Sequence, residues 1–120
     1  MRTIEDKIID ALNGSNGVKN LSCRDRVEVD GNTKKYYLWN SLLFWNDAEN
    51  VYYFSFCGYS TNTTKSRLNA IFNYFNLGGF YQKNYVVYWV NNGSAKIEVD
   101  TNKKYKIVFL GNHAVKIEEV

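Results

Sequence analysis

Apolar side chains recur at helical spacing near the start of the chain. Within residues 3–13 they lie three or four positions apart, which is typical of a helix with one buried face. Thr3 followed three residues later by Asp6 is a helix-start pattern, and Gly14 is a stop signal. We expect this amphipathic helix to pack on another element.

A second helical pattern begins after the middle of the chain and predicts a helix over residues 64–76. Its apolar stripe consists of Leu68, Ile71, Phe72 and Phe75. Gly78 and Gly79 follow directly and are expected to form its C-cap. We interpret this segment as the principal core helix.

Alternation with a period of two predicts strands in most of the remaining chain. Val27 and Val29 alternate with Glu28, and residues 30–32 then turn the chain into a returning strand at 35–39. Further strands are predicted at 42–45, 51–57, 85–90, 95–99 and 105–110, with a short final strand at 115–117. Residues 14–24 lack periodicity, so we expect a flexible loop there.

Turn-forming segments at 46–50, 91–94 and 100–102 separate these strands and indicate hairpins. Residues 52–56 are almost all large and apolar, which favours a central strand covered on both faces. The sequence therefore predicts a single α+β domain over residues 1–120. It consists of a twisted antiparallel sheet of five to seven strands with two helices, about 3–13 and 64–76, packed on it.

Two segments of the chain resemble each other, VEVDGNTKKYYLW at 27–39 and IEVDTNKKYKIVF at 97–109. Internal duplication is one explanation. The explanation we prefer is that two hairpins with the same turn chemistry have converged on similar sequences.

The composition is that of a folded protein, because 45% of the 120 residues are hydrophobic and 17% are aromatic. A net charge of +3 favours an acidic partner only mildly. No apolar run is long enough to span a bilayer, and the N-terminus does not resemble a secretion signal. With only Cys23 and Cys57 as cysteines, we expect a reduced, cytoplasmic protein without a membrane partner.

Hydroxyl side chains crowd the start of the second helix, where unpaired backbone N–H groups and the helix dipole favour an anion. Lys65 and Arg67 add two cations within one turn. One interpretation is a contact with phosphate or carboxylate. The other is that one of these side chains is simply the N-cap and that Arg67 pairs with a neighbouring strand.

The same stretch carries a motif, G-aromatic-x-T-x-T-T-K-x-R-L-N. Its members here are Gly58, Tyr59, Thr61, Thr63, Thr64, Lys65, Arg67, Leu68 and Asn69. This motif resembles a signature of small bacteriophage-encoded proteins of unknown activity, and the likeness extends over residues 39–72. The family often has Trp where this chain has Tyr59. The resemblance implies a phage origin, and with it a place in the cytoplasm of an infected bacterial host, but no particular mechanism.

Other residue patterns do not indicate catalysis. His113, the one histidine, lies in a predicted turn, and no nucleophile-elbow string is present. Glu28 and Glu98 alternate with apolar residues and are expected to be solvated. Two cysteines and one histidine are too few for a zinc site. We therefore predict no enzymatic activity, no catalytic residues, no cofactor and no metal.

Cations interleaved with aromatics, as in KKYYLWN and NKKYK, fit either a stacking platform for single-stranded nucleic acid or a β-rich aromatic core. We favour the core.

These patterns, with the phage resemblance, predict a non-enzymatic binding protein that inhibits a host protein, as anti-defence (anti-CRISPR-like) factors do. The alternative is a nucleic-acid-binding accessory protein, and pairing of exposed strand edges would give a homodimer. The predicted contact residues are Tyr59, Thr61, Thr63, Thr64, Lys65 and Arg67, together with Lys34, Lys35 and Tyr36 in a hairpin with exposed rings.

Overall fold

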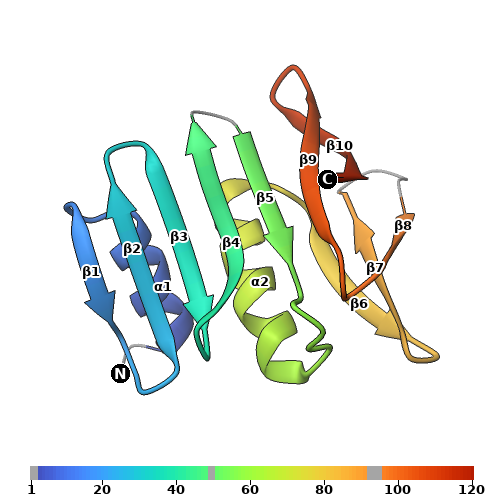
Figure 1. Cartoon of the computed structure of the whole chain (residues 1–120). Coiled ribbons are helices and arrows are strands. Elements are labelled where there is room, and N and C mark those ends of the chain that lie inside the picture. Colours follow the sequence, from blue (N-terminus) through green and yellow to red (C-terminus); the bar gives the residue numbers. More distant parts are fainter. Residues whose placement is uncertain (1–2, 49–50, 92–95) are drawn as a thin grey trace.

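A seven-stranded antiparallel sheet forms the main body of the molecule, and both helices lie behind its strands β1 to β5 in Figure 1. The computed structural model describes residues 3–48, 51–91 and 96–120. The strands of this sheet, in their order across it, are β1 (Gly17–Asn20), β2 (Asp25–Asp30), β3 (Thr33–Leu38), β4 (Ser41–Ala48), β5 (Val51–Ser55), β9 (Lys104–Leu110) and β10 (His113–Glu119). The predicted α+β fold with a sheet of five to seven strands and two helices is confirmed.

Helix α1 (Ile4–Leu12) matches the first predicted helix closely. The Thr3 hydroxyl accepts a hydrogen bond from the Asp6 backbone N–H at 3.2 Å, which is the expected N-cap. The buried residues Ile8, Ala11 and Leu12 face the sheet, and α1 contacts β2 and β3. The amphipathic pattern therefore identified both the helix and its buried face.

Helix α2 (Asn62–Phe75) is also present, but the predicted C-cap is wrong. The helix ends at Asn76, which adopts the left-handed conformation with φ 58°. An Asn side chain tolerates that conformation better than most residues, so the helix ends before it reaches the two glycines. Gly79 instead begins a strand.

A second, three-stranded antiparallel sheet was not predicted. It consists of β6 (Gly79–Lys83), β7 (Val86–Val90) and β8 (Lys96–Val99). Strand β6 was missed because its glycine start was assigned to the helix end. The predicted loop at 14–24 is likewise wrong in part, because β1 lies within it and pairs with β2.

The expectation that residues 97–109 form a hairpin like residues 27–39 is also wrong. Strands β2 and β3 do pair with each other. By contrast, β8 pairs with β7 in the small sheet and β9 pairs with β5 and β10 in the large one. The similar strings therefore fold into different arrangements, because the strand partners come from elsewhere in the chain.

The remaining strand predictions agree with the structure apart from their ends. The final strand is longer than expected, and His113 begins it instead of lying in a turn. The predicted connections at 46–50 and 91–94 lie partly outside the described residues, as does Ala95.

Aromatic rings join the two sheets through α2. Phe72 of α2 lies 4.7 Å from Phe80 of β6 and 5.3 Å from Phe54 of β5, measured between ring centroids. Phe54 also stacks on Tyr105 of β9 at 5.3 Å. These rings belong to one hydrophobic cluster, which holds the C-terminal half of α2 between β5 and β6.

Candidate functional site

A cavity of about 240 Å³ opens where helix α2 begins. It lies between that helix start and the turn that joins β3 to β4. Its lining residues are Arg24, Leu38, Trp39, Tyr59, Thr61, Thr63 and Thr64. Four of the predicted contact residues, Tyr59 and the three threonines, therefore lie together, and we call this site the Trp39–Tyr59 cavity.

The threonines build the rigid floor of the cavity. Thr61 is the N-cap of α2, and its hydroxyl accepts a hydrogen bond from the Thr64 backbone N–H at 3.2 Å. The Thr64 hydroxyl contacts the Thr61 hydroxyl at 3.0 Å and is buried. Two of the hydroxyls predicted to contact a partner are thus used to start the helix, as the capping interpretation predicted.

Two exposed aromatic rings form the rim. Trp39 is 61% exposed and Tyr59 is 50% exposed, although both are large apolar side chains. Eight of the 20 aromatic residues are buried in the core and five are exposed, and Trp39 and Tyr59 are the exposed rings that line this cavity. Exposed aromatic residues beside a concave site are typical of recognition surfaces.

The backbone of Trp39 is in the left-handed region, with φ 51°, and Asn40 follows with φ 63°. This conformation suits glycine or asparagine, and it costs about 1–2 kcal/mol for a residue with a bulky side chain. The Trp39 N–H donates to the Arg24 carbonyl oxygen at 2.9 Å, which ties the turn to the residue that precedes β2. The turn therefore holds a Trp ring at the rim of the cavity in a conformation that Trp does not favour.

Arg24 and the positive end of the α2 dipole are the positively charged groups at the cavity. The Arg24 side chain is 43% exposed, and its Nε lies 3.8 Å from Oδ2 of the buried Asp25 carboxylate, so its charge is partly balanced. No carboxylate is among the described residues that line the cavity. An acidic or neutral group is therefore favoured there over a cation.

Beneath the cavity lies a buried charged network centred on Asp25. Arg67 Nε donates to Asp25 Oδ1 at 3.0 Å, Ser22 Oγ donates to Asp25 Oδ2 at 2.7 Å, and the Tyr36 hydroxyl donates to Asp25 Oδ1. Arg67 also contacts Glu5 of α1, with 3.3 Å between Nη1 and Oε2. This network connects both helices to β2 and β3.

The ionisation states follow from these contacts. Burial raises the pKa of Asp25, but hydrogen bonds from Tyr36, Ser22 and Arg67 outweigh burial and hold the pKa below its usual value. Burial, together with the Asp25 carboxylate, raises the pKa of Tyr36 well above its usual range. Burial lowers the pKa of Arg67, but Asp25 reverses that effect and the pKa is raised on balance. Asp25 and Arg67 are therefore charged at neutral pH and Tyr36 is not.

The predicted exposure of several contact residues is wrong. Arg67 is 5% exposed and Tyr36 is fully buried, because both are needed to balance the Asp25 carboxylate inside the protein. The interpretation in which Arg67 pairs with a neighbouring strand is the one that the structure confirms. Neither side chain can reach a partner without unfolding of this region.

The predicted lysines do not join the cavity either. Lys65 Nζ donates to Gln82 Oε1 of β6 at 2.6 Å. Lys34 lies over the Phe75 ring, 5.9 Å from its centroid, on the face that carries the helices. Lys35 follows Lys34 along β3 and so lies on the opposite face of the sheet.

Sequence reasoning missed Arg24, Leu38 and Trp39. Trp39 was predicted to end the strand at 35–39, whereas β3 ends at Leu38 and Trp39 lies in the turn. A usable signal was Asn40 directly after it, because Asn is typical of turns. Burial of Asp25 was also indicated, since it precedes Val27 and Val29 at a spacing of two and so belongs to the same core face.

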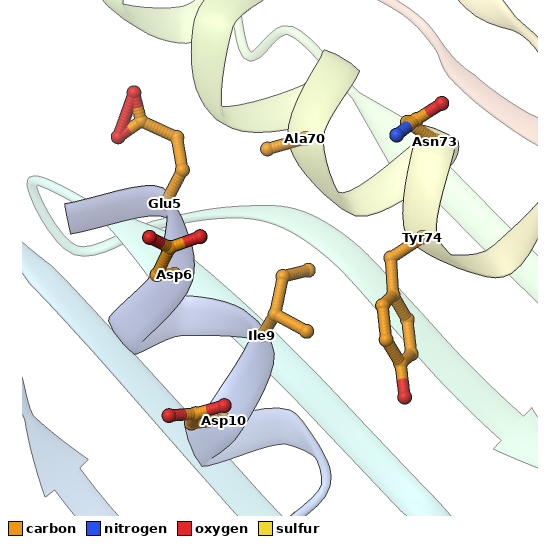
Figure 2. Close-up of a pocket in the computed structure, with 7 residues that line it drawn as sticks. All are labelled: Glu5, Asp6, Ile9, Asp10, Ala70, Asn73 and Tyr74. Carbon is orange, nitrogen blue, oxygen red and sulfur yellow. The ribbon is translucent and has the colours of Figure 1, made fainter. Parts of the chain in front are cut away.

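A second hollow, of about 450 Å³, lies between α1 and α2 (Figure 2). Glu5, Asp6, Ile9 and Asp10 line it from α1, and Ala70, Asn73 and Tyr74 line it from α2. Figure 2 shows the three carboxylates spaced along α1 and not pointing to one centre. Glu5 is already held by Arg67 and Ser66. This hollow is less suited to a ligand than the Trp39–Tyr59 cavity.

Two other features concern metal chemistry and membranes. Within residues 3–48, 51–91 and 96–120, no group of three or more His, Cys, Asp or Glu side chains is placed to hold a metal ion. In the same part of the chain, neither helix has the length and apolarity to cross a bilayer. Cys23 is exposed, Cys57 is half-buried, and both are free thiols.

Most residues of the phage-like motif have structural roles. Gly58 adopts φ 82°, Thr61 caps α2, Arg67 neutralises Asp25, and Leu68 is in the core. Asn69 makes two hydrogen bonds to the backbone of Phe80, accepting from its N–H at 2.7 Å and donating to its carbonyl at 3.1 Å. The motif thus specifies how α2 joins the two sheets, and it leaves Tyr59 exposed.

The fold and the cavity define a small α+β protein that presents a Trp–Tyr pair at the start of a helix. Residues 1–109 match the family described as the Kyanoviridae Gp96 protein. Because this match covers most of the chain, the protein belongs to that phage family, and the predicted phage origin is confirmed. Comparisons with curated proteins and with solved structures give no significant match.

Proposed function

We propose that this phage protein is a non-enzymatic binding protein that inhibits a host protein, as an anti-defence (anti-CRISPR-like) factor would. The observation that carries the proposal is the convergence of Trp39, Tyr59 and Arg24 on one cavity. Trp, Tyr and Arg are the residue types most enriched among side chains that dominate binding energy at protein interfaces. The phage family membership supports the choice of a host protein as the target.

The cavity suits a single inserted side chain of the partner. Its volume of about 240 Å³ is small for a free metabolite, whose pockets usually measure about 300–1,000 Å³. The rings of Trp39 and Tyr59 supply apolar area, and Arg24 favours a carboxylate on the partner surface. The preferred target site is therefore an apolar side chain bordered by acidic residues.

The strained backbone of Trp39 supports a role in binding. An outlying conformation that persists at an exposed residue suggests a functional reason for that residue, because stability alone favours Gly or Asn there. The buried Asp25 network lies beneath the cavity and holds the rim elements in place before any partner arrives. A preformed site loses less entropy on binding.

An affinity pull-down from bacterial host lysate tests the proposal. The wild-type chain is compared with the double variant Trp39→Ala/Tyr59→Ala and with a control, Tyr74→Ala/Tyr81→Ala. Tyr74 and Tyr81 are 52% and 37% exposed but lie outside the cavity. Nuclease treatment of each sample removes proteins captured through nucleic acid.

The expected result is a host protein that the wild type and the control retain after nuclease treatment and that the cavity variant loses. The purified chain should then lower the activity of that protein. Equal capture by all three chains would show that the binding surface is not the Trp39–Tyr59 cavity. Capture of a host protein without loss of its activity would contradict the inhibitory role.

A further inference from the structure

The face of the large sheet opposite the helices carries a row of aligned side chains across four strands. Lys35 of β3 is opposite Trp45 of β4, and Trp45 is opposite Tyr53 of β5. Tyr53 is in turn opposite Lys106 of β9. The register therefore places two aromatic rings side by side with a lysine at each end of the pair.

The alternation of the strands fixes the face on which this row lies. Tyr36, Phe44 and Phe54 are buried, and Phe44 contacts Phe72 of α2. Their sequence neighbours Lys35, Trp45 and Tyr53 must then point away from the helices. Figure 1 shows both helices on one side of β1 to β5, so no helix covers this row.

The two rings are stacked. Their centroids are 5.4 Å apart and their planes differ by 6°. Because each ring turns one face to the other, the outer face of Trp45 is directed toward Lys35 and the outer face of Tyr53 toward Lys106. Both rings are half-buried, so a flat group can approach their outer faces and edges from solvent.

Further cations share this face. Lys104 of β9 lies two residues from Lys106 and so points the same way. On β2, the Arg26 guanidinium lies over the Tyr37 ring, 4.2 Å from its centroid.

Two carboxylates flank the row, because Glu28 is opposite Lys35 and Glu118 is opposite Lys106. Each of them pairs with another cation, Glu28 with Arg26 and Glu118 with Lys116. Lys35, Lys104 and Lys106 form no ion pair with any residue that the structure describes, so this face keeps an excess of positive charge.

We propose that this face, defined by Lys35, Trp45, Tyr53, Lys104 and Lys106, binds single-stranded nucleic acid. Bases stack on aromatic side chains whatever their sequence, and lysines neutralise the phosphates. Protein–protein interfaces are depleted in lysine, which favours nucleic acid over a protein as the occupant. This inference is independent of the Trp39–Tyr59 cavity, which the β3–β4 turn and the start of α2 form.

The distances between the lysines also fit the backbone of an extended single-stranded nucleic acid. Neighbouring strands lie about 4.8 Å apart, so Lys35 and Lys106 are separated by about 14 Å across the row. Residues two apart along one strand, such as Lys104 and Lys106, are separated by about 6.6 Å. An extended nucleic-acid strand can place successive phosphates near Lys104 and Lys106, and phosphates two nucleotides apart near Lys35 and Lys106.

Fluorescence anisotropy with dye-labelled oligothymidine, oligouridine and a DNA duplex tests this inference. The variant Lys35→Gln/Lys106→Gln is compared with the control Lys7→Gln/Lys83→Gln, which removes the same charge from exposed lysines of α1 and β6. We expect the Kd for a single strand at 50 mM salt to rise about tenfold or more in the first variant and to change little in the control. The slope of log K against log salt should become shallower by about 1.4 in the first variant alone.

Tryptophan fluorescence locates the contact. Oligothymidine should quench the wild type and Trp39→Phe, but the quenching should be lost in Trp45→Phe. Preference for oligouridine or oligothymidine identifies RNA or DNA as the ligand. Duplex-only binding, absence of binding at 50 mM salt, or equal weakening by both glutamine variants would overturn the inference. The variant Trp39→Ala/Tyr59→Ala should bind oligonucleotide like the wild type. The oligonucleotide test of the sheet face and the pull-down test of the cavity can therefore give independent results.

Discussion

Arg67 of α2 and Asp25 of β2 form a buried ion pair, with 3.0 Å between Nε and Oδ1, although 42 residues separate them in the sequence. The pair holds the N-terminal half of α2 against β2, and Arg24, just before β2, and Tyr59, shortly before α2, line the Trp39–Tyr59 cavity. Its geometry therefore controls both the stability of the fold and the shape of the candidate site.

Breaking this pair should destabilise the protein strongly. Replacement of Asp25 by Asn or of Arg67 by Met should lower the free energy of unfolding by about 3 kcal/mol or more, because the remaining buried charge loses its main partner. Urea denaturation followed by circular dichroism measures the effect. The exposed pair Lys103–Glu119 provides the control, and Lys103→Met should change stability little. Equal effects at the two sites would show that the buried pair has no special role.

The pair also predicts a pH dependence. The pKa of Asp25 is lower in the folded protein than the value of about 3.9 expected in the unfolded chain. The unfolded state therefore binds the proton more readily, and the stabilisation is present above pH 4 and is lost as the pH falls through the folded pKa. Urea titrations of the wild type and Asp25→Asn between pH 7 and pH 2.5 should give unfolding free energies that converge in acid. A gap that stays constant over this range would contradict the assignment.

Gly78 should tolerate no side chain. A Cβ at this position would lie 2.4 Å from the Val90 carbonyl oxygen and 2.9 Å from Trp89 Nε1, and its φ is +96°. We expect Gly78→Ala to cost about 2–4 kcal/mol, since both the backbone conformation and the packing against β7 oppose it. Gly111→Ala is the matched control, because Gly111 has φ +64° but open space around it, and it should cost only about 1 kcal/mol. Thermal denaturation of the two variants shows whether the steric clash or the backbone conformation contributes more to the destabilisation by Gly78→Ala.

Local sequence patterns predicted the helices and strands that have strong periodicity. They failed where contacts between distant residues determine whether a strand forms or which strand it pairs with. The alternation around Val27 and the stripe of α2 depend on few residues and were sufficient to predict those elements. Strand β1 was missed because its four residues gain their order from pairing with β2. The pairing of β8 with β7 agrees with the hairpin predicted around residues 91–94. The expected pairing of β8 with β9 failed, because nothing in residues 100–102 shows that the chain crosses there from the small sheet to the large one.

The candidate site was predicted only in part for the same reason. Tyr59 and the threonines are contiguous in sequence, so their grouping was visible. The exposure of Arg67 and Tyr36 was misjudged because their common partner, Asp25, is distant from Arg67 in the chain. Trp39 was overlooked because its importance arises from its proximity to Tyr59 in space and from its left-handed backbone.

The most direct test of the Trp39–Tyr59 cavity is the variant Trp39→Gly, measured for both stability and partner capture. Glycine adopts φ 51° without strain, so the free energy of unfolding should stay the same or rise by about 1 kcal/mol. Capture of the host protein should be lost. Retained capture, or a loss of capture that accompanies unfolding of the chain, would contradict the claim that Trp39 serves binding and not the fold.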